Sequence, residues 1–296
     1  MVENNDILPN ENENTNLPQM PKSYVFEPNF KVNEYLNIID TQKEKIDKLK
    51  PLNDNLWGVI EEKLRFEWTH NTNAIEGSTL TKSETFFFLT EGITAKGKPF
   101  KDFVDVNNHN QALDYLADVV KGQRSISESF IKDINALLLQ GVKYTKAINQ
   151  FRQQVNKPTT PGEYKKLPNH VLQLDGTIHN YTEPEQVAPQ MEFLFKWINE
   201  NINKLHPIIV SAIAHYNMVK IHPFDDGNGR GARILMNVVL MNSGYPPAII
   251  EMDKRDEYIT SLREADKNNL IDFVAFISNS LIKTQETILE ELNRKS

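Results

Sequence analysis

The chain contains no cysteine among its 296 residues. This absence excludes disulfide bonds, thiolate metal sites and cysteine nucleophiles together. Any catalytic centre in this chain must therefore use histidine, carboxylate, hydroxyl, lysine or arginine side chains.

Long hydrophobic runs are also missing, because no stretch approaches the roughly 18 apolar residues that a membrane-spanning helix needs. The N-terminal sequence MVENNDILPNENENTNLPQMPK has neither the basic nor the hydrophobic segment of a secretory signal. We therefore expect a cytoplasmic protein without a membrane partner.

Basic residues are in deficit, since 33 Lys and Arg stand against 40 Asp and Glu and give a formal net charge of −7. The aromatic residues are scattered, without the interleaved basic residues of a stacking platform. Both features argue against nucleic acid as the main partner.

Apolar residues recur at a spacing of three to four along most of the chain, which predicts a mainly α-helical fold. Residues 1–28 are rich in Asn, Glu and Pro and predict a flexible tail. Residues 29–121 form an N-terminal helical region, and residues 122–296 form a core with C-terminal helices. Within this core, Ser125 and Glu128 resemble a capping box that opens a helix.

Residues 152–185 differ in kind, because prolines and glycines interrupt any helix there and short apolar runs lie between them. This composition predicts a small β-hairpin. Its polar side chains Lys165, Lys166 and His170 are expected to be solvated. A buried helix then begins at Pro207, a favourable first-turn residue, and ends near Ile221.

The stretch HPFDDGNGRGAR, residues 222–233, joins that helix to another one that begins near Gly229. The N-terminus of a helix attracts anions, because its first N–H groups are unpaired and the helix dipole is positive there. Glycines at 227, 229 and 231 let a phosphate approach the backbone, and the side-chain amide of Asn228 can add to the site. The guanidinium groups of Arg230 and Arg233 can clamp phosphate oxygens.

A carboxylate and an imidazole complete this stretch. Asp226 suits a Mg²⁺ ion that is shared with substrate phosphates, whereas Asp225 is expected to point elsewhere. His222 can take a proton from an attacking hydroxyl. The implied chemistry is phosphoryl or nucleotidyl transfer.

The histidine and the glycines of this stretch also have simpler interpretations. A histidine before proline is often structural, and a glycine-rich loop is often only a turn. The loop lacks the acidic spacing of an EF-hand, and its glycines do not form GxGxxG after a strand. A second stretch, GITAKGK at residues 92–98, fits GxxxxGK, but Pro99 replaces the Ser or Thr that would hold Mg²⁺, so a connector loop is predicted.

The stretch at 222–233 resembles the signature of the Fic domain family, HPFxDGNGRxxR, at every defined position. The similarity extends from about Trp68 to Asn279 and implies a multi-helix Fic-type fold with a small hairpin flap. Fic proteins transfer AMP from ATP to a hydroxyl side chain of a target protein with Mg²⁺. The resemblance assigns His222 as the general base and Asp226 as the metal ligand, with the phosphate cradle at residues 227–230.

A second motif, TNAIEG at residues 72–77, could simply be a helix end with a solvated Glu76 and a capping Gly77. It is also similar to the inhibitory motif (S/T)xxxE(G/N) of one class of Fic proteins, in which the Glu pairs with the second signature arginine, here Arg233. The resemblance thus implies that Glu76 holds the enzyme inactive, and that its removal activates and destabilises the protein. In some relatives this glutamate also supports removal of AMP.

The resemblance is less complete elsewhere. The segment GEYKKLPNHVLQLDGTIHNYTEP is longer than a plain flap, and its register cannot be fixed from the sequence. Tyr258 and Asp266 lie where relatives contact the nucleoside, but Ile259 replaces a neighbouring aromatic residue of some of them. Transfer of another nucleotide such as UMP, or a non-catalytic regulatory module, therefore remain alternatives. Many relatives dimerise, which implies a homodimer.

Overall fold

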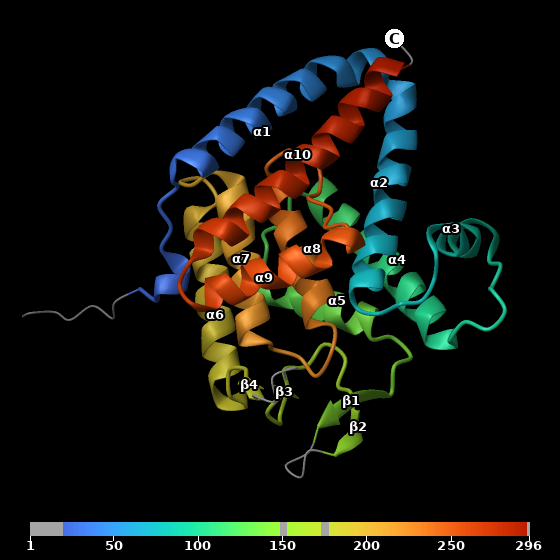
Figure 1. Ribbon diagram of the computed structural model, residues 1–296, viewed down its shortest axis with the longest axis vertical. Helices are drawn as coiled ribbons and strands as arrows, with labels where there is room; N and C mark the ends of the chain where they lie inside the picture. Colours follow the sequence, from blue (N-terminus) through green and yellow to red (C-terminus); the bar gives the residue numbers. More distant parts are fainter. Residues whose placement is uncertain (1–19, 149–152, 173–177, 295–296) are drawn as a thin grey trace, which may run out of the picture.

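The computed structural model describes residues 20–148, 153–172 and 178–294. Within these ranges, ten α-helices form the body of the molecule and two small antiparallel sheets lie at one end of it (Figure 1). The α-helices are α1 (Phe30–Leu49), α2 (Asp54–Ile75), α3 (Lys82–Glu91), α4 (Phe100–Lys121), α5 (Glu128–Leu138), α6 (Pro184–Asn201), α7 (Pro207–Ile221), α8 (Asn228–Asn242), α9 (Arg255–Asp266) and α10 (Leu270–Arg294). The 3-10 helices are η1 (Lys22–Tyr24), η2 (Lys50–Asn53) and η3 (Met252–Lys254). The predicted mainly α-helical fold is confirmed.

Helices α7 and α8 form the centre of the core and pack against each other (Figure 1). Both helices are buried along most of their length, as expected for helices that are apolar on most faces. Helix α10 also contacts α7, and it runs along α1. The boundaries of α7 match the prediction, with Pro207 in the first turn and Ile221 as the last residue.

The segment before α1 is not an isolated tail over its described part. Residues 22–24 form η1, and the ring of Tyr24 is 7% exposed and packs edge-on against Phe193 of α6. Asn217 of α7 donates a hydrogen bond from Nδ2 to the carbonyl of Ser23. The predicted tail therefore does not extend to residue 28, and its residues 1–19 lie outside the described part of the chain.

The β-structure is more extensive than the single hairpin expected within residues 152–185. Strand β1 (Tyr144–Ile148) pairs antiparallel with β2 (Gln154–Pro158), and β3 (His170–Leu172) pairs antiparallel with β4 (Ile178–Asn180). There are thus two hairpins in these ranges, and the first begins upstream of the proline- and glycine-rich segment that predicted it.

The N-cap of helix α5 is not the residue that the sequence predicted. Its N-cap is Ser127, whose hydroxyl accepts a hydrogen bond from the amide of Phe130, so the predicted capping box of Ser125 with Glu128 is wrong. The opposite end of α5 is held by α4, because Asn108 donates from Nδ2 to the carbonyls of Leu138 and Gln140. Helices α4 and α5 therefore form a fixed wall beside α8.

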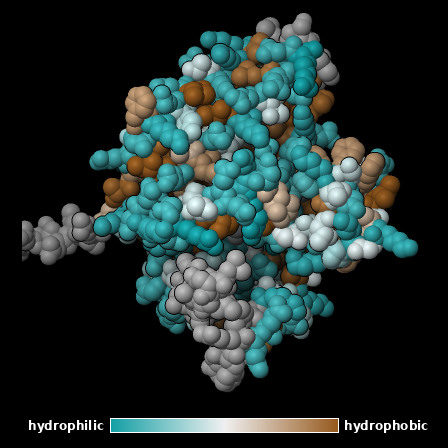
Figure 2. Space-filling view, in the orientation of Figure 1, coloured by the Kyte–Doolittle hydropathy of each residue, from teal (hydrophilic) through white to brown (hydrophobic). Residues whose placement is uncertain are grey.

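The connector at residues 92–98 joins α3 to α4, as predicted. Gly92 caps α3 in the left-handed conformation at φ 69°, and Pro99 precedes the first residue of α4. Apolar side chains gather at the surface over α3, where Phe86 is 47% and Phe87 is 50% exposed, in an otherwise largely hydrophilic view (Figure 2). None of the helices in the described ranges combines the length and the apolar character that crossing a membrane requires.

Candidate active site

His222 terminates α7 in a conformation that few residues other than glycine adopt. Its backbone lies at φ 52° and ψ 61°, and its amide donates to the carbonyl of Met218 at 3.0 Å. Non-glycine residues with positive φ are uncommon, and they are often found at functional sites. The backbone therefore fixes the direction in which the imidazole leaves the chain.

The side chain of Asn228, which was predicted to contribute to the anion site, closes the loop after His222. Asn228 accepts from the amide of Phe224 at Oδ1 and donates from Nδ2 to the carbonyl of the same residue, both at 2.9 Å. Asn228 is 2% exposed. Its amide thus holds the loop in shape rather than facing a ligand.

The three glycines of the loop serve three different purposes. Gly227 adopts φ 75° as the N-cap of α8. A Cβ at Gly231 would lie 3.0 Å from the Cε of Met218, so this glycine permits α8 to pack closely on α7. A Cβ at Gly229 would lie 2.5 Å from Oε1 of Glu76, so the carboxylate occupies the space that a side chain at 229 would fill.

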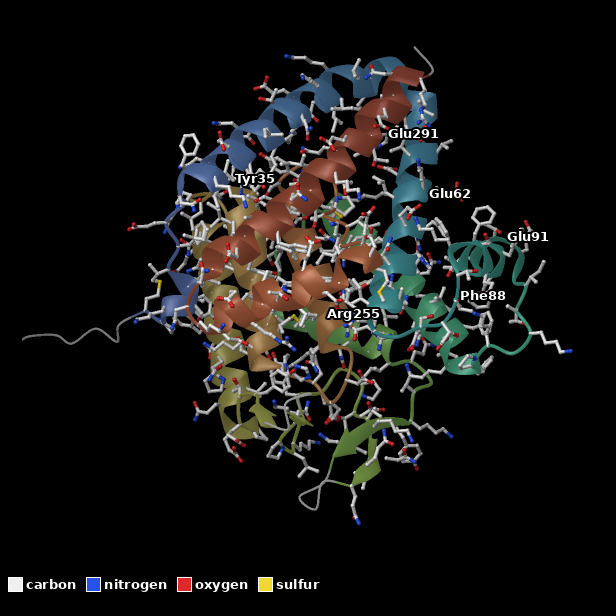
Figure 3. The ribbon with its side chains drawn as sticks, in the orientation of Figure 1. Tyr35, Glu62, Phe88, Glu91, Arg255 and Glu291 are labelled. Atoms are coloured by element: carbon white, nitrogen blue, oxygen red, sulfur yellow. The ribbon has the colours of Figure 1, made fainter. Side chains whose placement is uncertain are left out.

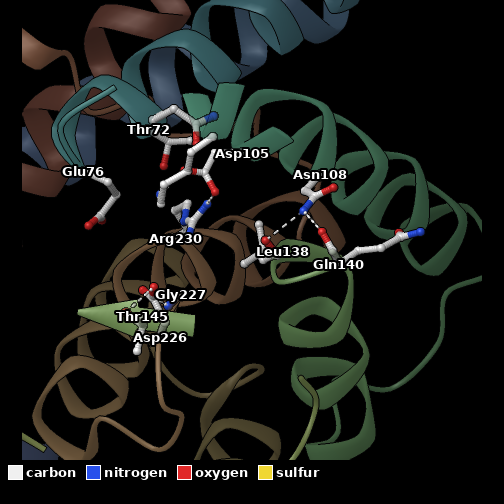
Figure 4. Close-up of polar contacts among 12 residues, drawn as sticks. Thr72, Glu76, Asp105, Asn108, Leu138, Gln140, Thr145, Asp226, Gly227 and Arg230 are labelled. Carbon is white, nitrogen blue, oxygen red and sulfur yellow. Dashed lines mark hydrogen bonds and ion pairs between the residues drawn. The ribbon is translucent and has the colours of Figure 1, made fainter. Parts of the chain in front are cut away.

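Asp226 is oriented from both sides of the loop (Figure 4). Its Oδ2 accepts from the hydroxyl of Thr145 in β1 at 2.9 Å, and its Oδ1 accepts from the amide of Gly227 at 2.6 Å. Its carbonyl accepts from Nδ2 of Asn135 in α5 at 2.9 Å. The hydroxyl of Thr145 thus helps to orient the Asp226 carboxylate. The sequence does not predict this contact, since nothing near Thr145 in the chain indicates it.

Asp225 points away from this carboxylate, as expected, and it binds β2 and the segment between the two hairpins. It pairs with Lys157 at 2.7 Å and accepts from the hydroxyl of Thr160 at 2.8 Å. The same segment reaches the loop at two further points. The amide of Lys165 donates to the carbonyl of Pro223, and Nδ2 of Asn169 donates to that of Phe224.

Lys165 is therefore not solvated, and that expectation is wrong. The residue is 2% exposed, and burial, with the nearby charge of Lys157, lowers the pKa of its ammonium group to about 8. Lys166 is exposed, as expected, and pairs with Glu163. The segment between the two hairpins thus packs directly against the loop at residues 223–226.

Arg230 faces α4 and is paired inside the protein. Its Nη1 lies 3.0 Å from Oδ1 of Asp105, and the two side chains are 4% and 9% exposed (Figure 4). Lys101 also contacts this carboxylate. The motifs do not include Asp105, although a carboxylate between the apolar residues Phe103 and Val106 is the kind of signal that indicates a buried ion pair.

Arg233 faces the end of α2, where three acceptors surround it. Its Nε donates to the hydroxyl of Thr72 at 2.7 Å, and its Nη2 donates to the carbonyl of Thr72 at 3.2 Å and to Oε1 of Glu76 at 2.6 Å. Arg233 is 3% exposed, whereas the Glu76 side chain is 43% exposed. The structure therefore contains the pairing of Glu76 with Arg233 that the motif predicted.

The charges of this pair act on each other. Partial burial opposes ionisation of Glu76, but the guanidinium groups of Arg233 and Arg230 lower the pKa of its carboxyl below the ordinary value. Burial would likewise lower the pKa of Arg233, but the Glu76 carboxylate raises it. Both groups are thus charged at neutral pH.

A hollow of about 460 Å³ opens beside Glu76, between the end of α2 and the start of α9. Arg255 lies at this junction and donates from Nε to the carbonyl of Ile75 at 3.0 Å (Figure 3). The hollow explains why the carboxylate of Glu76 is partly exposed although its partner Arg233 is not.

The two residues proposed for nucleoside contact already have partners inside the protein, and the Tyr258 hydroxyl also interacts with Arg233. Tyr258 is 2% exposed, and its hydroxyl lies 2.9 Å from Nε2 of His215 in α7. Asp266 accepts from the hydroxyl of Tyr216 at 3.0 Å. Burial, with the charge of Arg233, lowers the pKa of His215 to about 3, so the imidazole beneath Tyr258 is neutral.

The residues available for a metal ion are few. Within the described ranges no group of three His, Asp or Glu side chains could hold one. A single carboxylate at the start of a helix still fits Mg²⁺, because this ion keeps several waters and takes its remaining ligands from substrate phosphates. Asp226 offers such a carboxylate.

The chain resembles known proteins in both sequence and fold. Residues 125–240 match the Fic/DOC family model. The chain is 31% identical over 256 residues to the protein adenylyltransferase Fic of Drosophila erecta, which covers 86% of this chain and 48% of that protein. The chain thus spans about half the length of the curated relatives it matches.

Two solved structures are similar over most of the chain. A Fic domain containing signaling protein from Bacteroides thetaiotaomicron has a TM-score of 0.77 at 29% identity, over 88% of this chain and 98% of that chain. Fic-1 from C. elegans has a TM-score of 0.74 at 25% identity, over 90% and 74%. Because the family match contains the whole stretch 222–233 and the likeness of fold extends far beyond it, the chain contains a Fic/DOC domain.

Proposed function

We propose that the protein transfers AMP from ATP to a hydroxyl side chain of a target protein and that Glu76 holds it inactive. The observation that carries this proposal is the ion pair that Glu76, at the end of α2, makes with Arg233. Arg233 lies near the start of α8, the helix that follows His222 and Asp226. The Drosophila erecta relative is named for this activity.

The start of α8 supports a phosphate site. Its first helical hydrogen bond runs from the amide of Gly231 to the carbonyl of Gly227 at 2.8 Å, and the helix has no side-chain N-cap. The amides of residues 228–230 thus have no acceptor within the helix. Together with the dipole of α8 and the fork of Arg233, these amides suit the oxygens of a triphosphate.

The metal-binding role falls to Asp226. Its carboxylate oxygens, which now accept from Thr145 and Gly227, are hard ligands of the kind that Mg²⁺ prefers. When bound, Mg²⁺ would neutralise charge on the phosphates. Thr145 and the amide of Gly227 keep the carboxylate turned toward the start of α8.

His222 supplies the base. In the proposed reaction the target hydroxyl oxygen bonds to the α-phosphorus of ATP as its proton passes to the imidazole. The bond between the α-phosphorus and the bridging oxygen breaks, and pyrophosphate leaves with the electron pair. The left-handed conformation at His222 holds the imidazole at the entrance of the loop, where this proton transfer takes place.

Glu76 blocks the same place by charge and by volume. Its Oε1 bonds Arg233 and fills the space next to Gly229, which the terminal phosphate would need. A nucleotide would bind only with its phosphates displaced from the loop. Opening the pair frees both the guanidinium and the space.

The proposal is tested by incubating the full chain with labelled ATP and Mg²⁺, alone and in cell lysate, and by measuring the added mass on modified proteins. We expect Glu76→Gly to increase transfer and His222→Ala in that background to lower it by about 10²–10⁴-fold. The matched control Glu67→Gly changes a carboxylate of α2, the helix that precedes Glu76. Glu67 pairs with Lys82, and its removal should leave transfer unchanged. A folded Glu76→Gly protein that transfers nothing would overturn the proposal.

The choice of nucleotide is tested separately, because a phosphate cradle does not select the base. ATP, UTP, CTP and GTP are compared in the Glu76→Gly background by the mass that each adds. Addition of AMP supports the proposal, and addition of UMP would replace it with uridylyl transfer. No addition from any nucleotide favours a regulatory binding module.

A further inference from the structure

An aromatic ring covers the imidazole of His222. Tyr181 directly follows β4, and its ring centroid lies 3.7 Å from that of His222, with an angle of 19° between the planes. The other ring pairs in the described ranges are 4.9 Å or more apart, as for Tyr24 and Phe193. The two rings are therefore stacked face to face, and the contact is the tightest of its kind among these residues.

The backbone of His222 alone cannot set the plane of its ring. The left-handed conformation and the hydrogen bond to Met218 fix the Cα–Cβ direction. Rotation about χ1 and χ2 still moves the ring nitrogens, and the χ2 wells of histidine are broad. A contact outside the His222 backbone must select one plane, and Tyr181 makes such a contact on the ring face.

Tyr181 is itself placed by the segment between the hairpins. The ammonium of Lys165 lies 5.9 Å from the centroid of its ring, and Lys165 is anchored through its amide to the carbonyl of Pro223. Burial, with the carboxylates of Asp266 and Glu76, raises the pKa of the Tyr181 hydroxyl. The Tyr181 side chain is thus a neutral phenol that lies between Lys165 and His222.

We propose that Tyr181 is a positioning residue, which holds the imidazole of His222 in the plane that meets the incoming hydroxyl and shields one face of it. This inference rests on the proposed function. The target hydroxyl must then approach along the ring edge, since Tyr181 occupies a face. An imidazolium over a tyrosine ring is also stabilised by cation–π attraction, so the contact stabilises His222 after it has taken the proton.

The stack makes a specific prediction for kinetics and for pH. In the Glu76→Gly background, Tyr181→Leu should lower kcat about tenfold, while KM for ATP changes by less than about twofold, because an unpositioned base slows the chemical step alone. Without the aromatic face the imidazolium is less stable, so the pKa of His222 falls. The acid limb of the pH profile of kcat should move to lower pH.

Conservative variants separate the ring from the hydroxyl and from general loosening. Tyr181→Phe keeps the ring and should retain kcat within about threefold of its parent, since the face that contacts the imidazole is unchanged. Tyr115→Leu removes a stacked surface ring, which lies over Phe130 at 5.9 Å and 20°, and should change neither kcat nor the acid limb. A thermal melt of each variant accompanies the kinetics.

A readout without turnover follows the imidazole directly. NMR titration of His222, assigned with His222→Ala, should show equal pKa values in the parent and Tyr181→Phe and a lower value in Tyr181→Leu. Unchanged kcat and pH profile in Tyr181→Leu, or equal loss in Tyr181→Phe, would overturn the positioning role while the proposed function stands. Absence of transfer in the Glu76→Gly parent would overturn both.

Discussion

Two arginines stand three residues apart on α8, and their acidic partners differ in exposure. Arg230 pairs with Asp105 of α4, where the side chains are 4% and 9% exposed. Arg233 pairs with Glu76 at the end of α2, where the carboxylate side chain is 43% exposed. The same chemical group therefore braces the fold on one side and can be released on the other. Access of water to the acidic partner decides which role is possible, because a carboxylate that can be rehydrated leaves its partner at low cost.

The largest effect is expected from breaking the buried side. Asp105→Ala leaves the charge of Arg230 buried without its partner and should lower the free energy of unfolding by about 3–5 kcal/mol. Urea denaturation measures this loss. Asp114→Ala, on the same helix, breaks a pair with Arg65 in which the Asp114 side chain is 63% exposed and should cost less than about 1 kcal/mol. Equal losses in the two variants would contradict the distinction.

A smaller effect is expected from the neutral contact that holds Arg233. Thr72→Val keeps the shape of the side chain but leaves Nε–H of a buried guanidinium without its acceptor, at a cost of about 1–3 kcal/mol. Thr69→Val, about one turn earlier on α2, removes a bond to the neutral ring of His109 and should cost less. The ranking of the two losses in urea tests whether charge on the partner makes the difference.

Acid pH should weaken the region around both arginines. Burial, followed by the charges of Arg230 and Arg233, lowers the pKa of His109 well below its ordinary value, and burial and Arg233 lower that of His215 to about 3. Below pH 6.5 the unfolded chain binds protons that the folded protein does not, so stability falls as pH falls. Each histidine contributes up to about 1.4 kcal/mol per pH unit. His215→Gln should flatten this dependence, and an unchanged slope would assign it to other groups.

The smallest change in stability is expected from the exposed side of the comparison. Glu76→Gln removes the charge but keeps an oxygen that can accept from the buried Arg233, whereas Asp105→Ala leaves Arg230 without its acceptor. Because the Glu76 carboxylate is also partly hydrated, the loss should stay below about 1 kcal/mol. This is less than the 3–5 kcal/mol expected of a fully buried pair. Nucleotide transfer should nevertheless rise, although less than in Glu76→Gly because the side chain keeps its volume, so that activity and stability separate. A loss as large as that of Asp105→Ala would place both arginines in the same class.

Much of the fold could be predicted because its signals are local. Pro207 and the helical periodicity after it gave the boundaries of α7, and the glycines after His222 marked the start of α8. Other signals were ambiguous at short range. Ser125 and Ser127 both precede α5 within three residues, and only the geometry selects Ser127 as the cap.

The site residues that belong to a recognised motif could be predicted from the sequence. The residues that reach the site only through packing could not. Glu76 and Arg233 are brought together as their motifs implied, across 157 positions of sequence. Asp105, Thr145 and the burial of Lys165 depend on packing between elements far apart in the chain, for which a single sequence offers no pairing signal. The first hairpin began outside the proline-rich segment, because strand β1 itself contains no proline or glycine.

The carboxylate that lies where Gly229 has no side chain has a consequence for how inhibition behaves. Under the proposed function, Glu76 is a competitor tethered to the site it blocks, so its effective concentration is set by the end of α2 and not by the amount of protein. Dilution cannot relieve such inhibition. A signal that displaces the tether by the width of one carboxylate is enough to do so, without any change in His222 or in the loop.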